Sequence, residues 1–119
     1  MVYSIDEIKE KLNNVFQKYN LKKAYIFGSY ARGEATDTSD VDILIDTADS
    51  DIISLIDLSG FRIDCLETLQ KEVDVVTVQA LEQDDTKQNS YILIKNIMRE
   101  RIKLYDRERL SNIATYKEG

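Results

Sequence analysis

The sequence predicts an α/β domain in which helices cover one face of a β-sheet and the other face stays partly open. Two observations lead to this prediction. Segments with apolar residues at helical spacing alternate along the chain with short apolar runs rich in β-branched residues. In addition, 119 residues are enough for one compact domain but not for two, so residues 1–119 are expected to form a single domain.

The first helix is predicted from its start signal and its periodicity. Ser4, followed three residues later by Glu7, matches a capping box, in which each side chain bonds to the backbone N–H of the other residue. Apolar residues then recur at helical spacing up to Asn20, where the helix is expected to end. The apolar run at residues 24–27, which stops at Gly28, predicts a buried strand.

The rest of the chain continues the alternation of strands and helices. Apolar segments rich in β-branched residues predict strands, and Asp or Ser residues ahead of helical segments predict N-caps. The predicted elements are a strand at 41–45, a helix capped by Asp49 or Ser50 that runs to about Lys71, a strand at 73–78, a helix capped by Asp84 or Asp85 that runs to about Met98, and a strand at 102–105.

Composition excludes several classes of function. The net charge is −6, and an acidic protein repels phosphate backbones, so direct binding of nucleic acid is not expected. The chain has no His, which excludes His-based nucleophilic triads and argues against a zinc site. No apolar run approaches the roughly 20 residues of a membrane span, and the N-terminus carries no targeting signal, so a cytoplasmic location is expected. Cys65, the single cysteine, lies among apolar residues and is expected to be buried.

Three aspartates are candidates for a metal site. Asp40 and Asp42 stand two residues apart at the start of a strand, so strand alternation points both carboxylates to the same face. Asp74 takes the face opposite to its apolar neighbours, and the three carboxylates meet if the core faces of the two strands agree. Clustered carboxylates repel one another unless a cation compensates, and hard oxygen ligands suit Mg²⁺. The alternative is structural, with Asp40 in a turn and Asp42 and Asp74 at ordinary strand positions.

A second candidate element follows the first predicted strand. Gly28 permits a ligand to approach the backbone closely, Ser29 adds a hydroxyl, and the start of a helix offers N–H groups to a phosphate. Arg32 can add a charged contact. Taken alone, the segment is more simply interpreted as a Gly-Ser turn with Arg32 on the surface. Beside the three aspartates, phosphate binding is the favoured interpretation.

Together these segments resemble a known family. Residues 28–34 (GSYARGE) and 39–45 (SDVDILI) resemble the two-part motif of the nucleotidyltransferase superfamily that includes DNA polymerase β and kanamycin nucleotidyltransferase. The resemblance is closest to the minimal nucleotidyltransferase branch. Residues 73–76 (VDVV) fit the strand that carries the family's third carboxylate. The resemblance covers nearly the whole chain and implies the nucleotidyltransferase fold, a mixed sheet that carries helices.

The resemblance also implies a reaction and roles for single residues. A nucleoside monophosphate would pass from a nucleoside triphosphate, expected here to be ATP, to an acceptor hydroxyl, with two Mg²⁺ ions bound and pyrophosphate released. Asp40 and Asp42 would bind both ions, and Asp74 would bind the catalytic ion and help to deprotonate the acceptor. The residues expected to hold the nucleotide are Gly28 and Ser29 at the β- and γ-phosphates, with Arg32 and Ser39 as supporting contacts.

The same resemblance points to a protein partner. Minimal members of the family are typically the antitoxin of a toxin–antitoxin pair whose toxin is an all-helical HEPN-domain RNase, and the resemblance implies transfer of AMP to a tyrosine hydroxyl of that toxin. A short chain without a separate acceptor-binding domain agrees with this. Two alternatives remain, namely an antitoxin that acts by binding alone and transfer to a small-molecule hydroxyl such as that of an aminoglycoside. Three like charges kept together argue against the first, and the short chain argues against the second.

Overall fold

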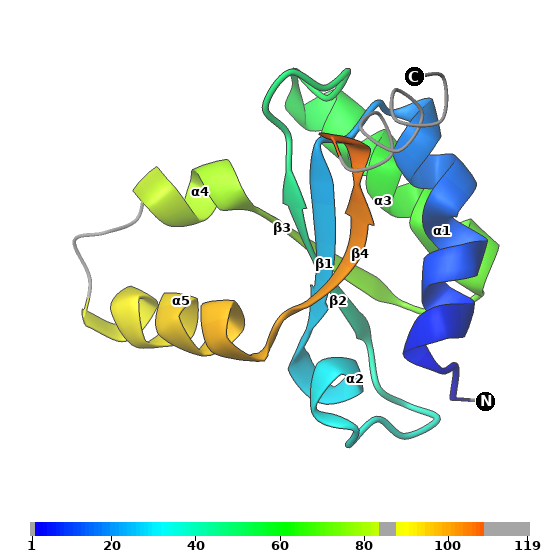
Figure 1. Cartoon of the computed structure of the whole chain (residues 1–119), viewed down its shortest axis with the longest axis vertical. Helices are drawn as coiled ribbons and strands as arrows, with labels where there is room; N and C mark the ends of the chain where they lie inside the picture. The colour runs from blue at the N-terminus through cyan, green and yellow to red at the C-terminus, as the bar shows by residue number, and fades with distance from the viewer. Residues whose placement is uncertain (1, 84–87, 109–119) are drawn as a thin grey trace, which may run out of the picture.

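The computed structural model describes residues 2–83 and 88–108, which fold around one mixed four-stranded sheet (Figure 1). The strands are β1 (Lys23–Phe27), β2 (Val41–Asp46), β3 (Val73–Thr77) and β4 (Ile102–Asp106). Their order is β3-β2-β1-β4. β1 runs antiparallel to both of its neighbours, and β2 and β3 are parallel. The predicted mixed sheet of an α/β domain is therefore confirmed.

Helices lie on both sides of this sheet but cover them unequally. They are α1 (Ile5–Lys18), α2 (Gly28–Arg32), α3 (Leu55–Leu69), α4 (Val78–Gln83) and α5 (Gln88–Glu100). α1 and α3 pack against each other and cover one face, whereas α4 and α5 lie on the opposite side (Figure 1). α5 reaches that second face through Ile97, so the face is only partly open. No helix in the described part of the chain is long and apolar enough to cross a membrane.

The capping box that opens α1 is present as predicted. The Ser4 hydroxyl accepts a hydrogen bond from the Glu7 N–H (3.1 Å), and the Glu7 carboxylate accepts one from the Ser4 N–H (2.9 Å). The helix ends at Lys18, and Asn20 follows in a left-handed conformation (φ 53°). The buried face of α1 consists of Ile8, Leu12, Val15 and Phe16, whose spacing is that of one helical stripe.

The prediction that Asp49 or Ser50 caps the long helix is wrong, because Ser54 is the N-cap of α3. The Ser54 hydroxyl accepts a hydrogen bond from the Asp57 N–H (3.2 Å). Ser50 closes a turn instead, with its hydroxyl donating to the Thr47 carbonyl oxygen (2.7 Å). Asp49 has a left-handed backbone (φ 54°), which suits a turn, whereas an N-cap has an extended one.

The strand predicted to extend to Val78 ends one residue earlier. The Thr77 hydroxyl accepts a hydrogen bond from the Ala80 N–H (3.0 Å), which satisfies one of the free donors at the start of α4. α4 is absent from the predicted elements, because a six-residue helix directly after a strand gives too short a periodic pattern to recognise.

The C-terminal ends of α3 and α5 differ slightly from the predicted ends. α3 stops two residues before Lys71, where Gln70 takes the left-handed conformation that often ends a helix (φ 56°). α5 extends two residues beyond the predicted end at Met98. The predicted caps of that helix, Asp84 and Asp85, lie outside the described residues.

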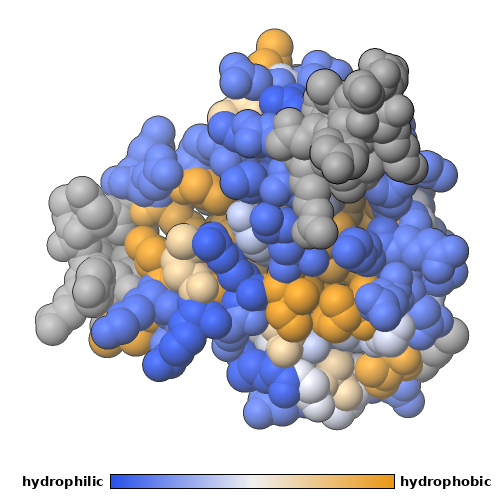
Figure 2. Space-filling view, in the orientation of Figure 1, coloured by the Kyte–Doolittle hydropathy of each residue, from blue (hydrophilic) through white to orange (hydrophobic). Residues whose placement is uncertain are grey.

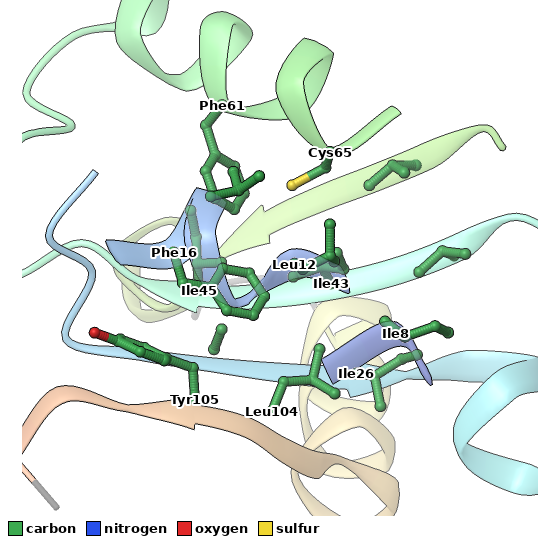
Figure 3. Packing of buried hydrophobic residues seen from close by; sticks show 14 of the residues in the cluster. Ile8, Leu12, Phe16, Ile26, Ile43, Ile45, Phe61, Cys65, Leu104 and Tyr105 are labelled. Atoms are coloured by element: carbon green, nitrogen blue, oxygen red, sulfur yellow. The ribbon is translucent and has the colours of Figure 1, made fainter. Parts of the chain in front are cut away.

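The main core lies between the sheet and the pair α1 and α3 (Figure 3). The rings of Phe16 and Phe61 stack at 6.2 Å between centroids, and the Tyr105 ring lies 5.5 Å from that of Phe16. Cys65 is fully buried in this core, as predicted, and burial raises the pKa of its thiol to about 12. This packing fixes which face of each strand points inward.

The opposite face of the sheet carries a smaller apolar cluster and a polar rim. Tyr25, Phe27 and Leu44 pack there with Ile97 of α5. The surface is mostly hydrophilic in the view of Figure 2, with separate apolar patches. Polar strand residues on the second face therefore lie next to this apolar cluster.

Candidate active site

Asp42 and Asp74 lie next to each other on the partly open face of the sheet. They are partners in the register of the parallel strands β2 and β3. Val41 and Val73, the residues before them, are both buried in the main core on the opposite face. The two carboxylates therefore share one face, as strand alternation predicts. Their role as metal ligands remains a prediction.

The third aspartate, Asp40, is exposed and immediately precedes β2. The turn in front of it is held by Ser39, whose hydroxyl accepts a hydrogen bond from the Thr36 N–H (2.8 Å). Ser39 thus helps to fix the backbone that leads to Asp40. Ser39, which is predicted to contact the nucleotide, therefore has a structural role in this turn.

The electrostatics of Asp42 show that the three carboxylates influence one another. The pKa of Asp42 is raised to about 6, first by burial and then by the negative charges of Asp74 and Asp40 and a hydrogen bond to Asp74. The positive charge of Arg32 acts in the opposite direction. A divalent cation would relieve this repulsion, and three carboxylates are the hard oxygen donors that Mg²⁺ accepts.

The side chains do not form a closed metal cage as they stand. Within residues 2–83 and 88–108, no three carboxylate or thiolate groups are arranged to hold a metal ion. Mg²⁺ usually keeps several waters and takes its remaining ligands from substrate phosphates, so an open, half-built set of carboxylates still fits this ion.

Gly28 begins α2 directly against the Asp42 side chain. Its backbone is left-handed (φ 73°), a conformation that residues other than glycine rarely adopt. A Cβ at this position would also overlap a carboxylate oxygen of Asp42. The backbone conformation and the lack of space for a Cβ both require glycine at this position. The start of α2 therefore contacts Asp42 through its backbone.

Arg32 and the Gly28 backbone meet at Glu100, the last residue of α5. Glu100 Oε1 accepts a hydrogen bond from the Gly28 N–H (3.0 Å), and Arg32 Nη1 lies 3.3 and 3.2 Å from the two Glu100 oxygens. Arg32 Nε also donates to Glu34 (3.0 Å). The bonds to Glu34 and Glu100 raise the pKa of Arg32 above its usual range.

Sequence reasoning missed Glu100 entirely. The residue belongs to no recognisable motif, and 72 positions separate it from Gly28. Its only sequence signal is its place at the end of a helical segment, which is common to many surface residues. The contact exists because α2 and α5 are brought together at one end of the sheet.

Comparison with known proteins gives a consistent picture. A model of nucleotidyltransferase domains matches residues 5–104. A relative from Methanocaldococcus jannaschii, named as a candidate protein adenylyltransferase, is 44% identical over 78 residues, which span 66% of this chain and 82% of the relative.

Solved structures share the fold at low sequence identity. A chain of a toxin–antitoxin crystal structure with AMP-PNP superposes with a TM-score of 0.64 at 21% identity, over 92% of this chain and 87% of the other. A chain of a complex between a tri-AMPylated HEPN toxin of Shewanella oneidensis and an MNT antitoxin gives 0.59 at 17% identity, over 96% and 87%. At these identities the likeness concerns the fold.

Proposed function

Because this chain belongs to the nucleotidyltransferase family, we propose that it transfers AMP from ATP to a tyrosine hydroxyl of a HEPN-domain toxin and thereby acts as the antitoxin of that toxin. The observation that carries the proposal is the pairing of Asp42 with Asp74 on adjacent strands, with Asp40 close enough to raise the pKa of Asp42. The proposed place of action is the cytoplasm.

The three aspartates would hold two Mg²⁺ ions. Asp40 and Asp42 would bind both ions, and Asp74 would bind the catalytic one. When bound, the ions supply stabilisation of the attacking and leaving oxygens in the phosphoryl displacement. Asp42 and Asp74 are fixed by the sheet, so their backbone positions need no change on binding.

In the proposed reaction the acceptor oxygen attacks the α-phosphorus of ATP. The new bond joins the acceptor oxygen to the α-phosphorus, and the bond from that phosphorus to the oxygen bridging to the β-phosphate breaks, so pyrophosphate leaves. Asp74 is exposed, and in the proposed reaction it would take the hydroxyl proton of the acceptor. A phenol, with a pKa of about 10, gives up this proton more readily than an aliphatic hydroxyl does.

The donors for the phosphates would come from α2. Gly28 lies against the Asp42 side chain, the Arg32 charge acts on the same carboxylate, and Ser29 adds a hydroxyl. These groups would orient the triphosphate so that its α-phosphorus is in line with the acceptor. Ser39 would contribute mainly by fixing the turn before Asp40.

The acceptor assignment is supported by the proteins that this chain resembles. Relatives are named for protein adenylylation, and one structural neighbour is a complex with a tri-AMPylated HEPN toxin. Neutralisation by contact alone is the second candidate. It is favoured by exposed apolar side chains before and at the start of α3, where Ile53, Leu55 and Ile56 are each at least 80% exposed.

The test is intact-mass spectrometry of a HEPN toxin co-expressed with this protein. AMP adducts on the toxin are expected with the parent chain and are expected to disappear with Asp42→Asn. Asp51→Asn, which changes an exposed aspartate in the loop before α3, is the matched control and should retain transfer. An unmodified toxin that is silenced equally by the parent and by Asp42→Asn would replace the proposal with neutralisation by contact.

A further inference from the structure

Glu100 contacts two of the three groups that the proposed function assigns to the phosphates, Gly28 and Arg32. Its carboxylate accepts the Gly28 N–H at 3.0 Å and lies 3.2 Å from the Arg32 guanidinium. On the basis of the proposed function, we propose that Glu100 is an internal stand-in for the nucleotide. It forms an autoinhibitory contact, and the phosphates of ATP must displace it before they can reach Gly28 and Arg32.

The chemistry of the contact supports a stand-in. A carboxylate and a phosphate are both recognised by backbone N–H groups and by guanidinium groups. Gly28 is buried, so its N–H needs an acceptor when no ligand is bound, and Glu100 provides one. A phosphate at the same donors would meet the Glu100 carboxylate as a like charge, so the two cannot occupy the place together.

The fold does not need Glu100 to hold α5 in position. Ile97, one helical turn earlier, is 2% exposed and packs with Tyr25 and Phe27 on the sheet. On the other side of Glu100, the Arg101 guanidinium stacks over the Tyr25 ring at 4.4 Å from the centroid. The helix end is therefore anchored on both sides, and the Glu100 side chain can turn away while α5 stays packed.

This arrangement predicts that removing Glu100 improves nucleotide binding. If the contact is formed in about 70–90% of the ligand-free molecules, its loss tightens the apparent binding of MgATP about three- to tenfold. A residue that only positioned α2 for the nucleotide would give the opposite sign, because its loss would disorder the phosphate donors.

The experiment measures the Kd of MgATP by calorimetry for the parent chain, Glu100→Ala, Glu100→Gln and Glu34→Gln. Both Glu100 variants are expected to bind more tightly. Glu34→Gln is the matched control, because Glu34 also bonds to Arg32 but does not touch Gly28, and its Kd should stay near the parent value. Equal tightening by Glu34→Gln, or unchanged or weaker binding by the Glu100 variants, overturns the stand-in while leaving the proposed function intact. Absence of MgATP binding to every variant and to the parent overturns both.

An NMR experiment tests the contact between Glu100 and the Gly28 amide directly. Gly28 is the one glycine of the four that follows a phenylalanine, so labelling with carbonyl-¹³C Phe and ¹⁵N Gly isolates its amide resonance. In nucleotide-free protein, Glu100→Ala should shift this resonance, and MgATP should shift it in the parent chain. An amide that does not respond to Glu100→Ala shows that Glu100 does not hold it in solution, and the stand-in is then rejected.

Discussion

The Asp42 carboxylate lies against the α-carbon of Gly28, in the space that a side chain at residue 28 would need. Gly28, the first residue of α2 after β1, thus packs directly against the side chain of Asp42 on β2. The contact couples the backbone conformation of one half of the motif to the position of a carboxylate in the other half.

Gly28→Ala is expected to reduce both stability and transfer. The new methyl group must displace Asp42, and the left-handed backbone adds strain of about 1–3 kcal/mol. Gly33→Ala is a matched control, because Gly33 is also left-handed (φ 74°) but has open space around its Cβ position. Thermal unfolding and a transfer assay measure the two effects. Similar losses in both variants would show that backbone strain alone, and not the contact with Asp42, is responsible.

Asp42→Asn should stabilise the metal-free protein at neutral pH. The folded-state pKa of Asp42, about 6, is above its ordinary value of 3.8, so the folded state binds this proton more strongly than the unfolded state does. The resulting stabilisation is present below about pH 4 and is lost as the pH rises through 6. Denaturation in EDTA should therefore favour Asp42→Asn at pH 7.5 and show a smaller difference at pH 4. A variant less stable than the parent at pH 7.5 would contradict the expected repulsion.

Magnesium should reverse this order of stability. A cation that binds the folded state and not the unfolded state raises the melting temperature, and the gain grows with the logarithm of its free concentration once that exceeds the Kd. The parent chain should gain stability in millimolar Mg²⁺ and lose it on chelation, whereas Asp42→Asn and Asp74→Asn should respond weakly. Asp51→Asn, at an exposed position in the loop between β2 and α3, should respond like the parent. A uniform response of all four proteins would indicate a general salt effect.

Ser54→Ala should lower the free energy of unfolding by about 1 kcal/mol, the usual effect of removing an N-cap hydroxyl. Ser59→Ala, at an exposed position within α3, is the comparison and should be neutral or slightly stabilising, because alanine favours helix. Urea denaturation measures both. If the two substitutions had equal effects, the Ser54 hydroxyl would not be acting as a cap in solution.

Much of the sheet could be predicted because its signals are local. Alternation along 41–45 and 73–76 places Asp42 and Asp74 opposite their buried neighbours, and the register of two parallel strands then sets them side by side. The N-cap of α3 is harder to predict from the sequence, because Asp49, Ser50 and Ser54 are all residue types that commonly cap helices. The three-dimensional structure distinguishes them, because Ser50 closes the turn before the helix and Ser54 bonds to the first turn of α3.

The rest of the candidate site depends on contacts between distant segments. Arg32 is predicted as a phosphate contact, but in the structure it bonds to Glu34 and to Glu100, and no local pattern reveals the second partner, which lies 68 residues away. Ser39 belongs to the motif, yet its hydroxyl holds a turn. Residue type and spacing predict correctly that Asp42 and Asp74 share one face, because strand geometry fixes that placement. They predict the partners of hydrogen-bonding side chains poorly, because many partners satisfy such side chains.

The buried position of Cys65 makes the native chain suitable for selective labelling. The single thiol is fully buried with a pKa of about 12, so it is neither accessible nor ionised in the folded protein at neutral pH. A maleimide dye would react with a cysteine introduced on the exposed face of α5, as in Asn96→Cys, and leave Cys65 untouched. In the parent chain, reaction of Cys65 itself would instead report the opening of the core, which gives a direct measure of unfolding under native conditions.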